Sequence, residues 1–188
     1  MSFTLASASP RRRALLEQLG LRFAVQSVDI DETPRDGEDP ERYVQRMAAE
    51  KLAAAQARFA GALLSADTTV TFDGTILGKP ASSGENASML RRLAGRTHRV
   101  ITAVAVFGET SASVAVQTEV TFGELSDARI NGYVRTGEGQ DKAGGYAIQG
   151  LGAGFVRAID GSYSNVVGLP LYETLGLLEQ TGAVPRWP

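Results

Sequence analysis

The order of the strand-like and helix-like segments is what most constrains the fold of this chain. An apolar run at residues 3–6 leads into a helical pattern that Gly20 ends, and a second helix is expected at residues 40–59. Two long alternating runs, at residues 99–107 and 113–122, then follow each other directly, which predicts antiparallel strands. Because helices do not separate all of the strands, the pattern argues against a purely doubly wound sheet and predicts an α/β fold with a mixed sheet. The other expected strands lie at residues 23–25, 62–72, 75–77, 155–159 and 163–167, and the other helices follow Ser82 and Ser126 or begin at Pro170.

We expect a single domain over residues 1–188. Its composition limits the kinds of chemistry that it can perform. Cysteine is absent and His98 is the only histidine, so disulfides, thiol nucleophiles and zinc sites of Cys or clustered His are excluded. Metal chemistry must therefore use oxygen ligands, which indicates Mg²⁺ or Mn²⁺. The net charge of −2 provides no overall basic field, and no apolar run approaches the roughly 20 residues of a membrane span. We expect a cytoplasmic protein with no nucleic-acid partner and no membrane partner.

The stretch Ser-Ala-Ser-Pro-Arg-Arg-Arg near the N-terminus places three arginines at the expected start of the first helix. Ser9 suits the N-cap and Pro10 the first helical position. Free N–H groups and the helix dipole favour anions there, whereas arginines in the first turn oppose that dipole. A bound polyphosphate would account for Arg11, Arg12 and Arg13. The alternative is a solvated basic helix start.

Two charged residues lie where the pattern predicts apolar surroundings. Lys51 falls on the apolar stripe of the helix expected at residues 40–59, so either its stem is buried with the ammonium in water or the ammonium points into a cleft. Asp67 lies in the strand-like run at residues 62–72, where a carboxylate is costly to bury without a partner. Asp67 would be a capped strand end, a member of a structural ion pair, or a Mg²⁺ or acid–base site.

Three loops carry weaker candidates. Asp31 and Glu32 are typical of a solvated loop, but next to Asp67 in space they could complete a Mg²⁺ site. Lys79 lies in a Gly-Lys-Pro turn that could be stiff or simply a surface turn. In the glycine-rich stretch that follows later, Gln149 offers both a donor and an acceptor, the complement of a uracil or thymine edge, although a tight turn is the alternative.

Taken in order, these motifs resemble one family over nearly the whole chain, the Maf (septum formation inhibitor-like) nucleoside triphosphate pyrophosphatases. The matching motifs are Ser-x-Ser-Pro-Arg-Arg at residues 7–12, Asp-Glu-Thr-Pro at 31–34, Glu-Lys at 50–51, Ala-Asp-Thr at 66–68, Gly-Lys-Pro at 78–80, Asp-Lys-Ala-Gly at 141–144, Ile-Gln-Gly at 148–150 and Tyr-Ser-Asn-Val-Val-Gly-Leu-Pro at 163–170.

The resemblance implies both a fold and a reaction. The fold would be inosine-triphosphatase-like, an elongated mixed sheet flanked by helices, with two lobes around a central cleft. The reaction would be hydrolysis of a nucleoside triphosphate to the monophosphate and pyrophosphate with a divalent cation. The Ala-Asp-Thr and Ile-Gln-Gly motifs resemble the dTTP/UTP branch rather than the branch preferring 7-methyl-GTP.

The resemblance also implies roles for individual residues. Asp67 matches the residue regarded as the proton acceptor in that family. The positions tied to substrate choice match Arg11, Thr68 and Gln149. The residues form a catalytic set (Asp67, Lys51, Lys79 and Glu32), a substrate-binding set (Ser9, Arg11, Arg12, Thr68 and Gln149) and a pair of metal ligands (Asp67 and Glu32). Whether Asp67 activates water or binds the metal stays open at this stage.

Two alternatives belong to other classes. The first is a nucleotide-binding regulator of septum formation with little turnover, and the second is a nucleic-acid-binding domain that uses the arginine cluster. The net charge disfavours the second alternative. The two long strands could support a homodimer.

Overall fold

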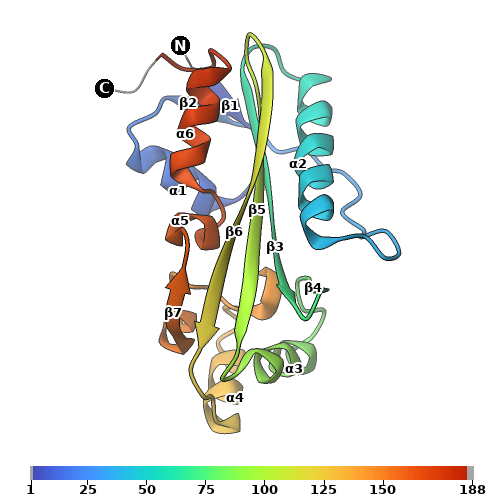
Figure 1. Ribbon diagram of the computed structural model, residues 1–188, viewed down its shortest axis with the longest axis vertical. Helices are drawn as coiled ribbons and strands as arrows, with labels where there is room; N and C mark the ends of the chain where they lie inside the picture. The colour runs from blue at the N-terminus through green and yellow to red at the C-terminus, as the bar shows by residue number, and fades with distance from the viewer. Residues whose placement is uncertain (1, 186–188) are drawn as a thin grey trace. The chain divides into compact units, whose positions relative to one another are not determined.

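The computed structural model describes residues 2–185 and has a mixed α/β fold (Figure 1). Its strands are β1 (Phe3–Leu5), β2 (Phe23–Val25), β3 (Leu63–Phe72), β4 (Thr75–Leu77), β5 (Thr97–Phe107), β6 (Ser111–Phe122) and β7 (Val156–Asp160). Its helices are α1 (Pro10–Gln18), α2 (Pro40–Gln56), α3 (Ser83–Leu93), α4 (Asp127–Arg135), α5 (Tyr163–Val167) and α6 (Leu171–Gln180), with two 3₁₀ helices, η1 (Ala143–Gly145) and η2 (Leu151–Phe155). Within residues 2–185, none of the helices combines the length and apolar character that a bilayer crossing requires.

The strands form one mixed sheet in the order β2-β1-β3-β5-β6-β7, with β4 paired to β3. Strand β1 runs parallel to β2 and β3, whereas the β3–β4 and β6–β7 pairs are antiparallel. Cross-strand contacts from Thr97 to Thr121 and from Arg99 to Gln117 show that β5 and β6 are antiparallel as well. The predicted α/β fold with a mixed sheet is therefore confirmed.

The chain forms two compact units, and β3 passes from one to the other between Asp67 and Thr68. Unit 1 comprises the described parts of residues 1–67, 102–116 and 168–188. In it, α2 lies on one side of the strands and α1 and α6 lie on the other (Figure 1). The backbone of α2 contacts β3 directly, because the Ser65 hydroxyl donates a hydrogen bond of 2.7 Å to the Ala48 carbonyl.

Unit 2 comprises residues 68–101 and 117–167. Helix α3 packs against α4, and an ion pair of 2.7 Å joins Arg91 to Asp127 across them. Its core contains the rings of His98, Phe122 and Tyr146, with a 2.8 Å hydrogen bond between His98 Nε2 and the Tyr146 hydroxyl. Burial lowers the pKa of His98 to about 4, so this histidine is neutral at physiological pH and belongs to the core of unit 2.

One predicted element is wrong, because residues 163–167 form helix α5 rather than a strand. The run of Val and Tyr favours a strand locally, but Ser162 caps a helical turn by accepting the N–H of Asn165. The buried Asn165 carboxamide then donates to the Val100 carbonyl at 3.1 Å and to the Thr118 hydroxyl at 2.9 Å. These contacts with distant segments favour the helix over the local strand propensity.

Candidate active site

The first helix begins as the sequence predicts. Ser9 is the N-cap of α1, its hydroxyl accepts the N–H of Arg12 at 3.4 Å, and Pro10 occupies the first turn. The side chain of Arg11, half-buried, makes no hydrogen bond or ion pair with another residue in the described range 2–185. Arg13, in contrast, is exposed and pairs with Glu17 at 2.8 Å on the helix surface. The arginines therefore differ in role, and Arg13 belongs to the surface of α1.

Arg12 turns back toward the end of β1. Its Nε donates to the Gly168 carbonyl at 2.8 Å, and one Nη donates to the Ser7 hydroxyl at 3.2 Å. Burial lowers the pKa of the Arg12 guanidinium, whereas the Asp67 carboxylate raises it. Arg12 is thus a fixed cation within the electrostatic range of Asp67.

Glu32, Lys51 and Asp67 lie in contact within unit 1, and we call them the carboxylate–lysine cluster. Lys51 Nζ lies 2.6 Å from Asp67 Oδ1 and 2.6 Å from Glu32 Oε1. The side chains of Lys51 and Asp67 are only 11% and 12% exposed, whereas Glu32 is 45% exposed. Lys51 does not extend to solvent, since its ammonium joins two carboxylates that are 35 residues apart in sequence.

The cluster owes its assembly to α2 and to the loop at residues 26–39, which we call the acidic loop. Asp39 caps α2 by accepting the N–H groups of Glu41 and Arg42, and Pro40 lies in the first turn. The buried stripe of α2 then includes Lys51 and faces the strands. Glu32 reaches Lys51 from the acidic loop, a placement that the sequence suggested only as a possibility.

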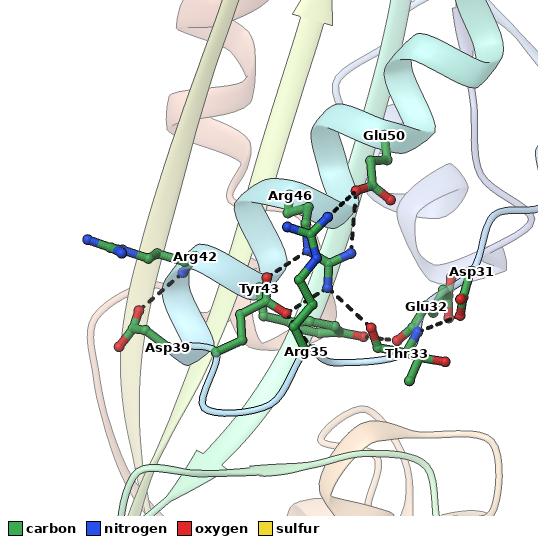
Figure 2. A network of polar contacts seen from close by, with 10 residues as sticks. Asp31, Glu32, Thr33, Arg35, Asp39, Arg42, Tyr43, Arg46 and Glu50 are labelled. Carbon is green, nitrogen blue, oxygen red and sulfur yellow. Dashed lines mark hydrogen bonds and ion pairs between the residues drawn. The ribbon is translucent and has the colours of Figure 1, made fainter.

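A polar network holds the acidic loop on α2 (Figure 2). Arg46 binds Glu38 in a bidentate ion pair with two contacts of 2.6 Å, and it also donates to the Thr33 carbonyl at 3.2 Å. The Tyr43 hydroxyl donates to the backbone carbonyl of Glu32 at 2.9 Å. The hydrogen bonds from Arg46 lower the pKa of Glu38 to about 2, so the pair is ionised at neutral pH. Tyr43 and Arg46 thereby fix the backbone at Glu32 and at the next residue, Thr33.

Arg46→Lys is expected to lower the rate of substrate turnover by a factor on the order of 10, as changes in residues that orient a site commonly do. Lysine keeps the charge but cannot form the bidentate pair with Glu38 and also contact the Thr33 carbonyl. Arg42→Lys is the matched control, because Arg42 is exposed on the same helix and points away from the network (Figure 2). Equal rates for the two variants, measured by steady-state kinetics, would show that the network does not position Glu32.

The remaining candidates lie in unit 2. Thr68 is half-buried on β3, directly after Asp67 in sequence. Lys79 is exposed in the turn after β4, and the preceding Gly78 carbonyl accepts the N–H of Gly144 at 3.2 Å. This contact places the Gly-Lys-Pro turn against the glycine-rich stretch, two motifs that are far apart in sequence.

Gln149 is exposed in the segment between η1 and η2, residues 146–150, which we call the glutamine loop. The neighbouring Tyr146 and Ile148 side chains are buried and anchor this loop in unit 2. Tyr146 therefore packs in the core instead of being available to stack on a base. The structure brings Glu32, Lys51, Asp67 and Arg12 together in unit 1 and leaves Thr68, Lys79 and Gln149 in unit 2.

The model of the Maf-like protein family matches residues 2–181. The chain belongs to this family. A dTTP/UTP pyrophosphatase of Myxococcus xanthus is 52% identical over 97% of this chain and 94% of its own length. A dTTP/UTP pyrophosphatase of Shewanella oneidensis is 49% identical over 98% of this chain and 100% of its own length.

Among solved structures, this Maf-like chain is similar to proteins of low sequence identity. A HAM1 protein from Coxiella burnetii is 16% identical, with a TM-score of 0.44 over 65% of this chain and 73% of that chain. The inosine-triphosphatase-like fold stays a prediction from the resemblance of the motifs.

Sequence patterns missed three residues that support the site of this Maf-like chain. The sequence pattern predicted no role for Arg46, Tyr43 or Glu38, because arginine, tyrosine and glutamate are ordinary residues near the start of an amphipathic helix. Their roles depend on which loop folds back over α2. The only local signal is that Tyr43 and Arg46 lie three residues apart, on one side of the helix.

Proposed function

We propose that this protein is a nucleoside triphosphate pyrophosphatase that hydrolyses dTTP and UTP to the monophosphate and pyrophosphate. The observation that carries the proposal is the carboxylate–lysine cluster, in which a largely buried aspartate contacts a buried lysine. Relatives about half identical over nearly the whole chain, named dTTP/UTP pyrophosphatases, support the choice of substrate. The Ala-Asp-Thr motif at residues 66–68 contains the same aspartate.

The reaction needs a water molecule to attack the α-phosphorus. The water oxygen forms a bond to phosphorus, the bond from phosphorus to the bridging oxygen breaks, and pyrophosphate leaves with that oxygen. Asp67 is the proposed acceptor of the proton from water, and Lys51 orients its carboxylate through the 2.6 Å contact. Asp67 is thereby the proposed catalytic base.

Cations are proposed to stabilise the charge that develops on the phosphoryl oxygens and on pyrophosphate. Arg11 and Arg12 extend from the first turn of α1, where the positive end of the helix dipole also favours an anion. Lys79, on its turn after β4, is the proposed cation from unit 2. Ser9 contributes by fixing the start of α1 through its capping hydrogen bond.

The donor set fits a divalent cation that is shared with substrate. Within residues 2–185, no group of three or more His, Cys, Asp or Glu side chains could hold a metal alone. Mg²⁺ commonly takes one or two carboxylates and completes its shell with water and substrate phosphates, a role that Glu32 and Asp67 could fill. Bound there, Mg²⁺ or Mn²⁺ would supply charge neutralisation for the phosphates.

Substrate choice is proposed to rest on Gln149, Thr68 and Arg11. The exposed Gln149 carboxamide can donate to one base atom and accept from another, which matches the O4 and N3–H edge of uracil or thymine. Cytosine presents the opposite pattern at these two positions. The homodimer and the cytoplasmic location stay predictions from the sequence.

Pyrophosphate release with Mg²⁺ from a panel of dTTP, UTP, CTP, GTP, 7-methyl-GTP and 5-methyl-UTP tests this proposal. Preference for dTTP and UTP is the expected result. Preference for CTP or 7-methyl-GTP would keep the reaction and contradict the proposed base recognition. Tight binding with negligible turnover of every triphosphate would favour the nucleotide-binding regulator instead.

A further inference from the structure

The carboxylate of Glu138 binds the backbone directly after the glutamine loop. Glu138 Oε2 accepts the N–H of Leu151 at 2.9 Å, and Oε1 accepts the N–H of Gly152 at 3.0 Å. These are the first two residues of η2, whose N–H groups lack partners within the helix itself. One ionised side chain thus holds two successive amides, a strong form of hydrogen bond.

Gly150 allows this carboxylate to come close to the loop. A Cβ atom at residue 150 would lie 2.2 Å from Glu138 Oε2, well inside contact distance. The backbone of Gly150 has a φ of −117°, which any residue can adopt. Glycine is therefore required here for space, and the space is filled by Glu138.

The other side of the glutamine loop is held through Tyr133. The buried Tyr133 hydroxyl accepts the N–H of Ala147 at 3.0 Å. Burial raises the Glu138 pKa, but hydrogen bonds from Leu151, Gly152 and Tyr133 hold it below its ordinary value overall. Glu138 is accordingly ionised at neutral pH. Its carboxylate holds the C-terminal end of the loop, and the Tyr133 hydroxyl holds the loop at Ala147.

We propose that Glu138 is a positioning residue for recognition of the pyrimidine base, because its carboxylate fixes the backbone directly after Gln149 while Tyr133 holds the backbone before it. This inference rests on the proposed function. The Gln149 side chain is exposed, so its own surroundings do not fix the direction of its carboxamide. To discriminate between uracil or thymine and cytosine, the Gln149 carboxamide must point in one direction before the base binds. The contacts of Glu138 and Tyr133 fix the backbone conformation on the two sides of Gln149 and so orient its side chain.

Glu138→Gln tests the proposal with almost no change in shape. A carboxamide places an NH₂ group against one of the two loop N–H groups, so one hydrogen bond is lost. We expect kcat/KM for dTTP to fall about tenfold, mostly through KM, and the preference for dTTP over CTP to fall by a similar factor. Glu119→Gln is the matched control, since Glu119 is exposed on β6 in the same unit and carries the same charge.

Two further measurements separate positioning from a general structural role. In a Gln149→Ala background, Glu138→Gln should leave the dTTP to CTP preference unchanged, because both changes act through the same carboxamide. Amide hydrogen exchange at Leu151 and Gly152 should accelerate in Glu138→Gln and not in Glu119→Gln. If Glu138→Gln does not fold, Gly150→Ala displaces the same carboxylate and should give the same loss of preference.

The outcomes are distinct. Additive effects of the Glu138 and Gln149 changes, or faster amide exchange with an unchanged dTTP to CTP preference, would overturn the inference and leave the proposed function intact. A wild-type protein that releases pyrophosphate from none of the triphosphates would overturn the proposed function, and the inference with it. Loss of preference that depends on Gln149 would support both.

Discussion

Asp67→Asn is expected to lower the rate of pyrophosphate release from dTTP about 10³-fold, in the range that loss of a general base produces. Asparagine keeps the shape of the side chain but cannot accept a proton from water. Binding of dTTP should persist, because the arginines of α1 and Lys79 are unchanged. Single-turnover kinetics and equilibrium titration with dTTP measure the two quantities separately.

Asp73→Asn is the control for this variant. Asp73 lies in the exposed turn that follows β3 and has a φ of 51°, a conformation that asparagine tolerates well. Its replacement removes the same charge near the end of the same strand and should leave the rate unchanged. Normal turnover by Asp67→Asn would remove Asp67 from the mechanism.

Lys51→Met is expected to reduce the free energy of unfolding by about 3–5 kcal/mol, the usual effect of removing one partner of a buried ion pair. The change removes the ammonium that both Asp67 and Glu32 contact, and it leaves the Asp67 carboxylate in a site that is only 12% exposed. Turnover should fall as well, because Lys51 orients that carboxylate. Urea denaturation at neutral pH measures the change in stability.

A double variant separates the buried charge from lost packing. Adding Asp67→Asn to Lys51→Met should recover part of the lost stability, since no unpaired carboxylate then remains on β3. The matched control is Arg13→Met, which breaks an ion pair whose side chains are 61% and 51% exposed and should cost at most about 0.5 kcal/mol. A loss of stability in Lys51→Met no larger than that of Arg13→Met would contradict the description of a buried cluster.

The sequence predicted those features that depend on residues close together in the chain, such as helix caps and charges within apolar segments. Ser9 was expected to cap the first helix, and the structure places it at the N-cap of α1, because a side-chain acceptor satisfies the nearby N–H groups without help from other segments. Lys51 and Asp67 were recognisable because each interrupts an apolar pattern. A charge in such a place needs a partner, although the pattern could not say that the two residues were partners of each other.

The features that the sequence did not predict depend on contacts between distant segments. Residues 163–167 form a helix because Asn165 is hydrogen-bonded to segments that lie more than 40 residues away. Arg46 and Glu138 are likewise ordinary surface-type residues until the acidic loop and the glutamine loop fold onto them. Hydrophobic periodicity carries no information about which loop returns to which side chain.

The products formed from dTTP test the central claim most directly. Phosphorus-31 NMR of wild-type protein with dTTP and Mg²⁺ distinguishes cleavage at the α-phosphorus from cleavage at the γ-phosphorus. Resonances of dTMP and pyrophosphate, growing in equal amounts, are the result that this account predicts. Formation of dTDP and inorganic phosphate, or persistence of dTTP with no product at all, would contradict it.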